Sequence, residues 1–228
     1  MPTHLITGAS SGIGAALATA LHQRGVDLVL LARNAERADQ LIAAFPGATA
    51  LMGDLEHPET LEASIGARMP ARLDSLLHVA GVLDLGSVAS LPVEVWQRTL
   101  TVNVSAPAEL TRLALPALRA ASGRVVFVNS GAGLNASPDW SAYAASKFAL
   151  RALADALRAE ERAAGVRVTS VYPGRTATPM QQKVHEQEGA EYDETRWIRP
   201  ESVAAAILAA LDLPRDADLT DIRVRPGE

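Results

Sequence analysis

Two side chains that could exchange a proton stand four positions apart in the segment YAASK, namely Tyr143 and Lys147. If this alanine-rich stretch forms a helix, residues at positions i and i+4 project from the same face, so the phenol and the ammonium share one volume. A neighbouring ammonium stabilises a phenolate, which would let the tyrosine act as a general acid or base. The same spacing also fits a solvated helix face, so the rest of the chain must decide between the two interpretations.

A glycine-rich loop, TGASSGIG, connects the first apolar segment to the first helical pattern. Glycines permit a tight turn and let a pyrophosphate approach bare backbone, while the N-terminus of the following helix offers N–H donors to its charge. A flexible Gly/Ser turn is the alternative. At the end of a first strand, however, the loop predicts a dinucleotide site whose contacts are Gly8, Ser10, Ser11, Gly12, Ile13 and Gly14.

The elements that must position these residues alternate along the chain. Strand-like segments lie near positions 4, 27, 48, 73, 123, 166 and 219, and helix-type spacing covers 16–23, 35–44, 58–68, 93–120, 140–164 and 200–211. Strict alternation predicts βαβ units and therefore a single α/β domain over residues 1–228, a Rossmann-type, doubly wound, seven-stranded parallel sheet with helices on both faces. In such sheets ligands bind beyond the carboxyl ends of the strands.

Composition excludes several classes of function. The chain has 228 residues, 48% hydrophobic and 21% charged, as expected for an ordinary globular protein. Its net charge of -5, without a dense Lys/Arg run, argues against nucleic-acid binding. Because it has no cysteine, neither a disulfide framework nor a thiolate nucleophile is available, and a cytoplasmic setting is consistent with this. We expect no bound metal, and no apolar run is long enough to span a membrane.

The spacing TG-x-x-x-G-x-G together with Y-x-x-x-K resembles the short-chain dehydrogenase/reductase family. This resemblance implies a catalytic tetrad of Asn103, Ser130, Tyr143 and Lys147, with Ser130 thirteen positions before the tyrosine. The residue that would donate to the Asn103 carbonyl in a helix is Pro107, which has no N–H, so that carbonyl is predicted to be free. In similar enzymes it holds a water linked to the lysine. A surface kink is the alternative interpretation.

The resemblance also implies the remaining cofactor contacts. After the second strand stands Arg33, where an acidic residue would favour NAD; an arginine suits a 2′-phosphate, so we expect NADP(H), with Asn34 or Arg37 as helpers. A surface arginine opening a helix is the alternative. The other implied contacts are Asp54, Ala80, Gly81, Pro173, Gly174 and Thr178, although Asp54 could equally be an N-cap residue.

The chain departs from the family pattern at two positions. Val79 replaces an asparagine thought to brace the central sheet, which puts stability in doubt, and Asn129 replaces the first serine of the S-S-x-A-G pattern. We expect His78, within a strand pattern, to be packed in the core.

The implied reaction is hydride transfer between the nicotinamide and a carbonyl or secondary alcohol, with Tyr143 as acid or base and its pKa lowered by Lys147. Residues 175–199 lack a clear period and are predicted to form a mobile substrate lid, in which His185 is expected to be exposed. The residues expected to line an apolar pocket are Met180, Trp197, Leu134 and Trp140.

Two other functions compete with this one. A nucleotide-sugar epimerase or dehydratase of the extended type is expected to show a different loop spacing and a longer substrate domain. A non-catalytic dinucleotide-binding regulator would not need Tyr143. By analogy with the family we expect a homodimer or homotetramer built on the helical segments 93–120 and 140–164, binding no nucleic acid and no membrane.

Overall fold

The sheet of the computed structural model, which describes residues 1–227, is parallel throughout and has the strand order β3-β2-β1-β4-β5-β6-β7. Its strands are β1 (Thr3–Thr7), β2 (Asp27–Ala32), β3 (Thr49–Met52), β4 (Ser75–His78), β5 (Arg124–Val128), β6 (Arg167–Pro173) and β7 (Asp221–Val224). The order reverses direction at β1, where β4 lies on the side opposite β2. The predicted seven-stranded, doubly wound parallel sheet is therefore confirmed.

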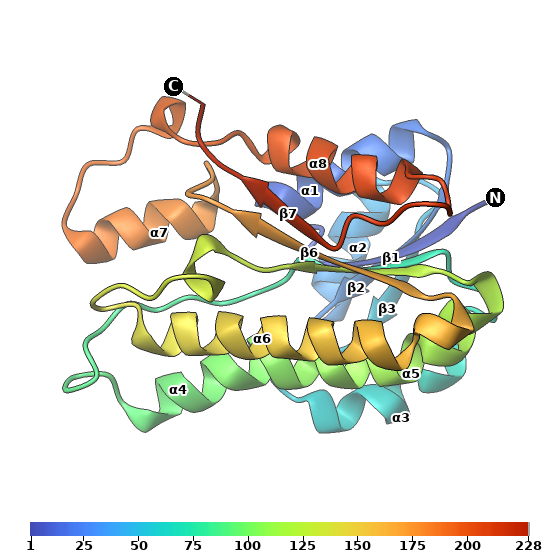
Figure 1. The fold of residues 1–228 in the computed structure, drawn as a ribbon, viewed down its shortest axis with the longest axis horizontal. Helices are drawn as coiled ribbons and strands as arrows, with labels where there is room; N and C mark the ends of the chain where they lie inside the picture. The colour runs from blue at the N-terminus through green and yellow to red at the C-terminus, as the bar shows by residue number, and fades with distance from the viewer. Residues whose placement is uncertain (228) are drawn as a thin grey trace.

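Helices cover both faces of this sheet (Figure 1). One face is covered by α1 (Gly12–Gln23), α2 (Ala35–Ala44) and α8 (Pro200–Asp212), and the other by α3 (Leu61–Ile65), α5 (Ala106–Ala121) and α6 (Ser141–Glu160). Each face has its own apolar core, and the central strands contribute alternate residues to both. Because both faces are buried, strands such as RVVFV are apolar at nearly every position rather than at every second one.

The helical segment predicted over 93–120 is interrupted. Helix α4 (Val93–Leu100) passes through a π-helical turn, Thr101–Ser105, before α5 begins. In this turn the N–H of Ala106 donates to the carbonyl of Thr101, five residues back. Pro107, which cannot donate, follows at the start of α5, so a widened turn stands where the alternative interpretation expected a simple surface kink.

One helix was missed by the sequence analysis, α7 (Pro179–Glu188), which lies in the segment expected to be irregular. The Thr178 hydroxyl caps its start by accepting from the N–H of Gln181 at 3.2 Å, and Gly189 ends it with φ of +65°. This helix stands beyond the carboxyl end of β6, at the left in Figure 1.

Candidate active site

A cavity of about 900 Å³ lies along the carboxyl ends of the strands, which is in the upper part of the range usual for ligand sites. It is lined by all the predicted cofactor contacts, from the glycine loop and Arg33 to Pro173, Gly174 and Thr178, and by Ser130, Tyr143 and Lys147. Asn103 does not line it. The structure thus brings together residues from the ends of six strands, β1 to β6, as expected for a doubly wound sheet.

The glycine loop is shaped so that a larger residue would close it. Gly8 and Gly12 have φ of +74° and +52°, which side chains rarely adopt. A Cβ atom on Gly14 would lie 2.1 Å from the carbonyl oxygen of Gly8, and one on Gly8 would lie 2.8 Å from the N–H nitrogen of Ala80. The N-cap residue Ser11 makes no side-chain capping bond. The loop therefore has the bare backbone that a pyrophosphate requires at the N-terminus of α1.

The far end of the cavity carries two arginines, the exposed Arg33 and the partly buried Arg37. Asn34, a proposed helper, is instead the N-cap of α2: its side-chain oxygen accepts from the N–H of Arg37 at 2.9 Å. Asp54 also lines this end and accepts from the N–H of Glu56 at 2.9 Å, so it forms a turn and is not a helix cap. The N-cap alternative for Asp54 is wrong.

Tyr143 and Lys147 lie on one face of α6, and both are buried inside the other end of the cavity. The Lys147 Nζ atom is 5.6 Å from the centre of the Tyr143 ring and donates to the Val128 carbonyl at 3.0 Å. The alternative interpretation, in which the two residues lie on a solvated helix face, is therefore wrong, because they are only 6% and 4% exposed.

The pKa values differ from the sequence-based expectation. Burial raises the pKa of Tyr143 to about 12, against the opposing effect of its hydrogen bond with Ser130. Burial likewise lowers the pKa of Lys147 to about 8. Desolvation therefore outweighs the effect expected from the ammonium, and Tyr143 is protonated at neutral pH. In this form the phenol is a proton donor.

Asn103, 1% exposed, lies in the π-helical turn behind this pair. Its side chain makes two hydrogen bonds with the backbone of Val82: Oδ1 accepts from the Val82 N–H and Nδ2 donates to the Val82 carbonyl, each at 2.9 Å. It also donates to Ser146 on α6 at 3.0 Å. A Cβ atom on Gly81 would lie 3.2 Å from Asn103 Oδ1 and 3.7 Å from Lys147 Nζ, so the asparagine and the lysine face the same glycine.

The sequence analysis missed the role of Asn129, which is buried beside the catalytic candidates. Its Nδ2 donates to the Lys147 carbonyl at 3.0 Å, and its Oδ1 accepts from the N–H of Ser130 at 2.8 Å. A Cβ atom on Gly133 would meet Asn129 Oδ1 at 2.3 Å, so the glycine leaves room for this amide. One side chain thus ties the serine after β5 to the helix that carries the lysine.

Charge and aromatic contacts hold residues 175–199, the segment predicted to be a mobile lid. Arg175 forms a two-fold ion pair with Glu188, at 2.8 and 2.5 Å, and its guanidinium lies over the rings of Trp140 and Trp197. The prediction that His185 is exposed was wrong: it is 4% exposed and packs edge-on against Tyr192 and Trp197.

The end of the cavity that contains Tyr143 has an apolar wall. Leu83, Tyr143 and Val184 form a small buried cluster, against which Trp140 and Met180 pack. Of the four residues expected to line an apolar pocket, Met180 and Trp140 do so; Leu134 and Trp197 lie outside the lining, the latter packed on His185.

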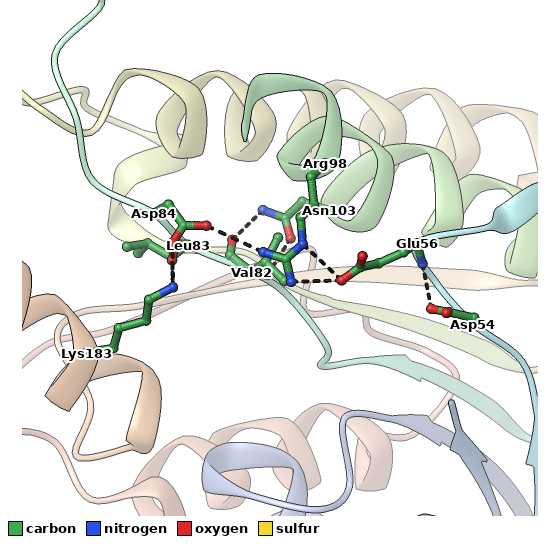
Figure 2. Close-up of polar contacts among 8 residues, drawn as sticks. All are labelled: Asp54, Glu56, Val82, Leu83, Asp84, Arg98, Asn103 and Lys183. Atoms are coloured by element: carbon green, nitrogen blue, oxygen red, sulfur yellow. Dashed lines mark hydrogen bonds and ion pairs between the residues drawn. The ribbon is translucent and has the colours of Figure 1, made fainter. Parts of the chain in front are cut away.

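A row of charged groups runs from α7 to the loop after β3 (Figure 2), and two of its members, Arg98 and Glu56, line the cavity. Lys183 on α7 pairs with Asp84, whose other oxygen is 3.5 Å from Arg98 on α4. Arg98 in turn donates to Glu56 at 2.9 and 2.8 Å, beside Asp54. These contacts connect α7 to α4 and to the loop after β3.

The other histidine prediction agrees with the structure: His78 is buried, stacked on Phe127 with ring centres 4.9 Å apart and within 2.9 Å of the Thr111 hydroxyl. Among residues 1–227 there is no group of three or more potential metal ligands. Nor does any helix in this described part have the length and apolar character needed to cross a membrane.

Comparisons with known proteins agree with this geometry. A family model described as short chain dehydrogenase matches residues 2–189. A Bos taurus protein, dehydrogenase/reductase SDR family member 11, is 31% identical, with 98% of this chain and 95% of the relative covered.

Two solved structures are similar over nearly the whole chain. A short-chain dehydrogenase from Sphingobium yanoikuyae in complex with NADPH is 30% identical with a TM-score of 0.82, covering 97% of this chain and 87% of the other. An oxidoreductase from E. coli, yciK, is also 30% identical, with a TM-score of 0.86 and coverage of 97% and 94%.

Proposed function

Because the chain belongs to the short-chain dehydrogenase family, we propose that it is an NADP(H)-dependent oxidoreductase that interconverts a carbonyl and a secondary alcohol. The observation that carries this proposal is the placement of Ser130, Tyr143 and Lys147 at one end of a cavity whose other parts are a glycine loop and Arg33. When bound, the nicotinamide supplies or accepts the hydride.

The chain's own residues handle the proton. In reduction, the Tyr143 phenol, protonated at neutral pH, gives its proton to the substrate oxygen as negative charge develops there. Ser130, held beside it by Asn129, donates a hydrogen bond to the same oxygen. Lys147 supplies a positive charge that stabilises the phenolate left behind. In oxidation the same groups act in the reverse order.

Asn103 has a supporting role in this proposal. Its side chain fixes the loop at Val82, and through Ser146, which donates to the Tyr143 carbonyl at 2.7 Å, it is connected to the helix of the catalytic pair. We retain the proposal that its backbone carbonyl holds a water linked to Lys147, because Pro107 removes the usual helical donor.

The preference for NADP(H) rests on Arg33 and Arg37, two cavity-lining cations at the end where a ribose phosphate would lie. A solved relative binds NADPH, which supports the same choice. A nucleotide-binding regulator without turnover is not favoured, since the catalytic groups are gathered and buried in the cavity.

The proposal is tested by titration calorimetry with NADPH and NADH, followed by NADPH consumption with a panel of carbonyl compounds. NADPH should bind at least tenfold more tightly, and Arg33→Ala should erase the difference, whereas Arg162→Ala, a surface control, should not. Tyr143→Phe should abolish turnover without weakening NADPH binding, and Tyr172→Phe, a buried tyrosine outside the cavity, should retain turnover. Equal affinity for the two nucleotides refutes the cofactor assignment; unchanged turnover in Tyr143→Phe refutes the mechanism.

A homodimer or homotetramer remains a proposal. Val93, Leu100 and Phe148 are 60%, 37% and 43% exposed on α4 and α6, the helices expected to form the interface. Light scattering of Phe148→Glu should show a smaller particle than wild type; an unchanged mass would remove this face from consideration.

A further inference from the structure

An arginine after the last strand reaches the substrate end of the cavity. Arg225 directly follows β7 and lines the cavity, together with Ser130 and Tyr143. The strand ends beside β6, where the N–H of Gly174 donates to the Val224 carbonyl at 2.8 Å. Since β6 lies between β5 and β7, a side chain from residue 225 that reaches the loop after β5 must cross the end of β6.

The guanidinium of Arg225 makes this crossing. A Cβ atom on Gly131 would lie 3.0 Å from Arg225 Nη1, and the same position is 3.8 Å from the Pro173 carbonyl oxygen. Gly131 is the neighbour of Ser130, the proposed hydrogen-bond donor to the substrate oxygen. The absence of a side chain at Gly131 therefore leaves room for a cation beside the reacting centre.

Two other arginines that line the cavity are paired, and Arg33 and Arg37, which have no ion pair among the described residues, lie at its opposite end. Arg175 is paired with Glu188 and Arg98 with Glu56, whereas within residues 1–227 the Arg225 side chain has neither an ion pair nor a hydrogen bond. The carboxylates that line the cavity are Asp54 and Glu56, both in the loop after β3 at the opposite end. The substrate end thus carries a net positive charge with an apolar wall across from it.

We propose that Arg225 binds a carboxylate of the substrate, so that the physiological substrate is an oxo acid, or the corresponding hydroxy acid, with an apolar remainder. The planar fork of an arginine matches a carboxylate through two parallel hydrogen bonds and would fix the orientation of the carbonyl toward Ser130 and Tyr143. Leu83, Val184 and Met180 then receive the apolar part. This inference rests on the proposed oxidoreductase function and names the substrate class for that site.

The test compares 2-, 3- and 4-oxo acids with their methyl esters as substrates of the full chain and NADPH. Wild type should have a higher kcat/KM for at least one acid than for its ester, and Arg225→Ala should lower this acid-to-ester ratio at least tenfold, the amount expected for a charge-assisted hydrogen bond. Arg225→Lys should recover part of it. Arg223→Ala, which removes an exposed arginine of β7 outside the cavity lining, should leave the ratio unchanged.

Three outcomes would overturn the inference: no preference for any acid in wild type, an unchanged ratio in Arg225→Ala, or an NADPH affinity that falls as much as the activity does, which would assign Arg225 to the cofactor. If no carbonyl compound is consumed, the proposed function fails. Calorimetry with the saturated carboxylic acids and their esters then still tests whether Arg225 binds a carboxylate. Binding of an acid that is lost in Arg225→Ala supports the carboxylate site; no binding to wild type overturns it.

Discussion

His78 makes the stability of the fold depend on pH in a window that can be calculated. The imidazole is fully enclosed between β4 and α5, stacked on Phe127, and burial lowers its pKa to about 3 from the ordinary 6.5. Because the folded-state pKa is lowered, the unfolded chain binds one more proton than the native state between these two values. The contribution of the neutral imidazole is thus complete above pH 6.5 and is lost progressively as the pH falls toward 3.

The size of the effect follows from 1.36 kcal/mol per pKa unit. Between pH 7 and pH 5 the free energy of unfolding should fall by about 2 kcal/mol through His78 alone. Other groups titrate in the same range, among them His4, whose pKa is also lowered by burial. The measurement must therefore be a difference between wild type and a variant that lacks the imidazole.

The assay is urea denaturation at pH 7 and pH 5, followed by tryptophan fluorescence, for wild type, His78→Gln and His57→Gln. His78→Gln will be less stable at pH 7 because it loses the stacking on Phe127, but its further loss at pH 5 should be about 2 kcal/mol smaller than that of wild type. His57→Gln, at an exposed histidine, should keep the wild-type pH dependence. Equal losses in wild type and His78→Gln would refute the assignment of a neutral, buried imidazole. If His78→Gln does not fold, the His78 pKa read by NMR in wild type decides, and a value above 5 refutes it.

Three further predictions concern the site. Gly14→Ala places a Cβ 2.1 Å from the Gly8 carbonyl oxygen and should weaken NADPH binding, measured by calorimetry, at least tenfold. The control Gly66→Ala, whose new Cβ would have its nearest neighbour 3.7 Å away, should bind NADPH as wild type does. Equal affinities of the two variants would contradict the loop geometry. Asn129→Leu removes two buried hydrogen bonds, so its free energy of unfolding should fall by about 2 kcal/mol. The substitution should also lower kcat more than it changes KM. A stable, fully active variant would show that the Asn129 side chain is not needed to hold Ser130 and α6 together. Because burial lowers the pKa of Lys147 to about 8, the rate of carbonyl reduction should decline above pH 8 as the ammonium loses its proton, and a flat pH–rate profile from 7 to 9 would exclude a requirement for the charge.

The sequence predicted the strands because both faces of a doubly wound sheet are buried, which produces unmistakable apolar runs such as DLVLLA. It failed at α7 because PMQQKVHEQE has no apolar stripe: of its ten residues only Gln181, Val184 and His185 are buried. This helix is held by contacts from distant parts of the chain, including the aromatic rings around His185, which no local pattern encodes.

The candidate site was predictable in position but not in its electrostatics. Strand ends and glycine spacing located the cavity, since each predicted contact had to follow a strand. The pKa of Tyr143 was not predictable, because it depends on how deeply the phenol is buried. Arg225 follows a strand end as the other contacts do, but nothing in the local sequence indicates that its side chain turns across β6 toward Gly131.

The replacement at Val79 can now be understood from the loop after β4. The N–H groups of Val79 and Ala80 both donate to the Thr7 hydroxyl, at 3.0 and 3.1 Å, so β1 holds the end of β4 through the backbone. The Val79 side chain packs against the apolar core of the α1 face. Farther along the loop, Asn103 grips Val82 from the π-helical turn. Because each of these bonds uses the loop's own backbone, the loop can keep its place without a side-chain amide at position 79.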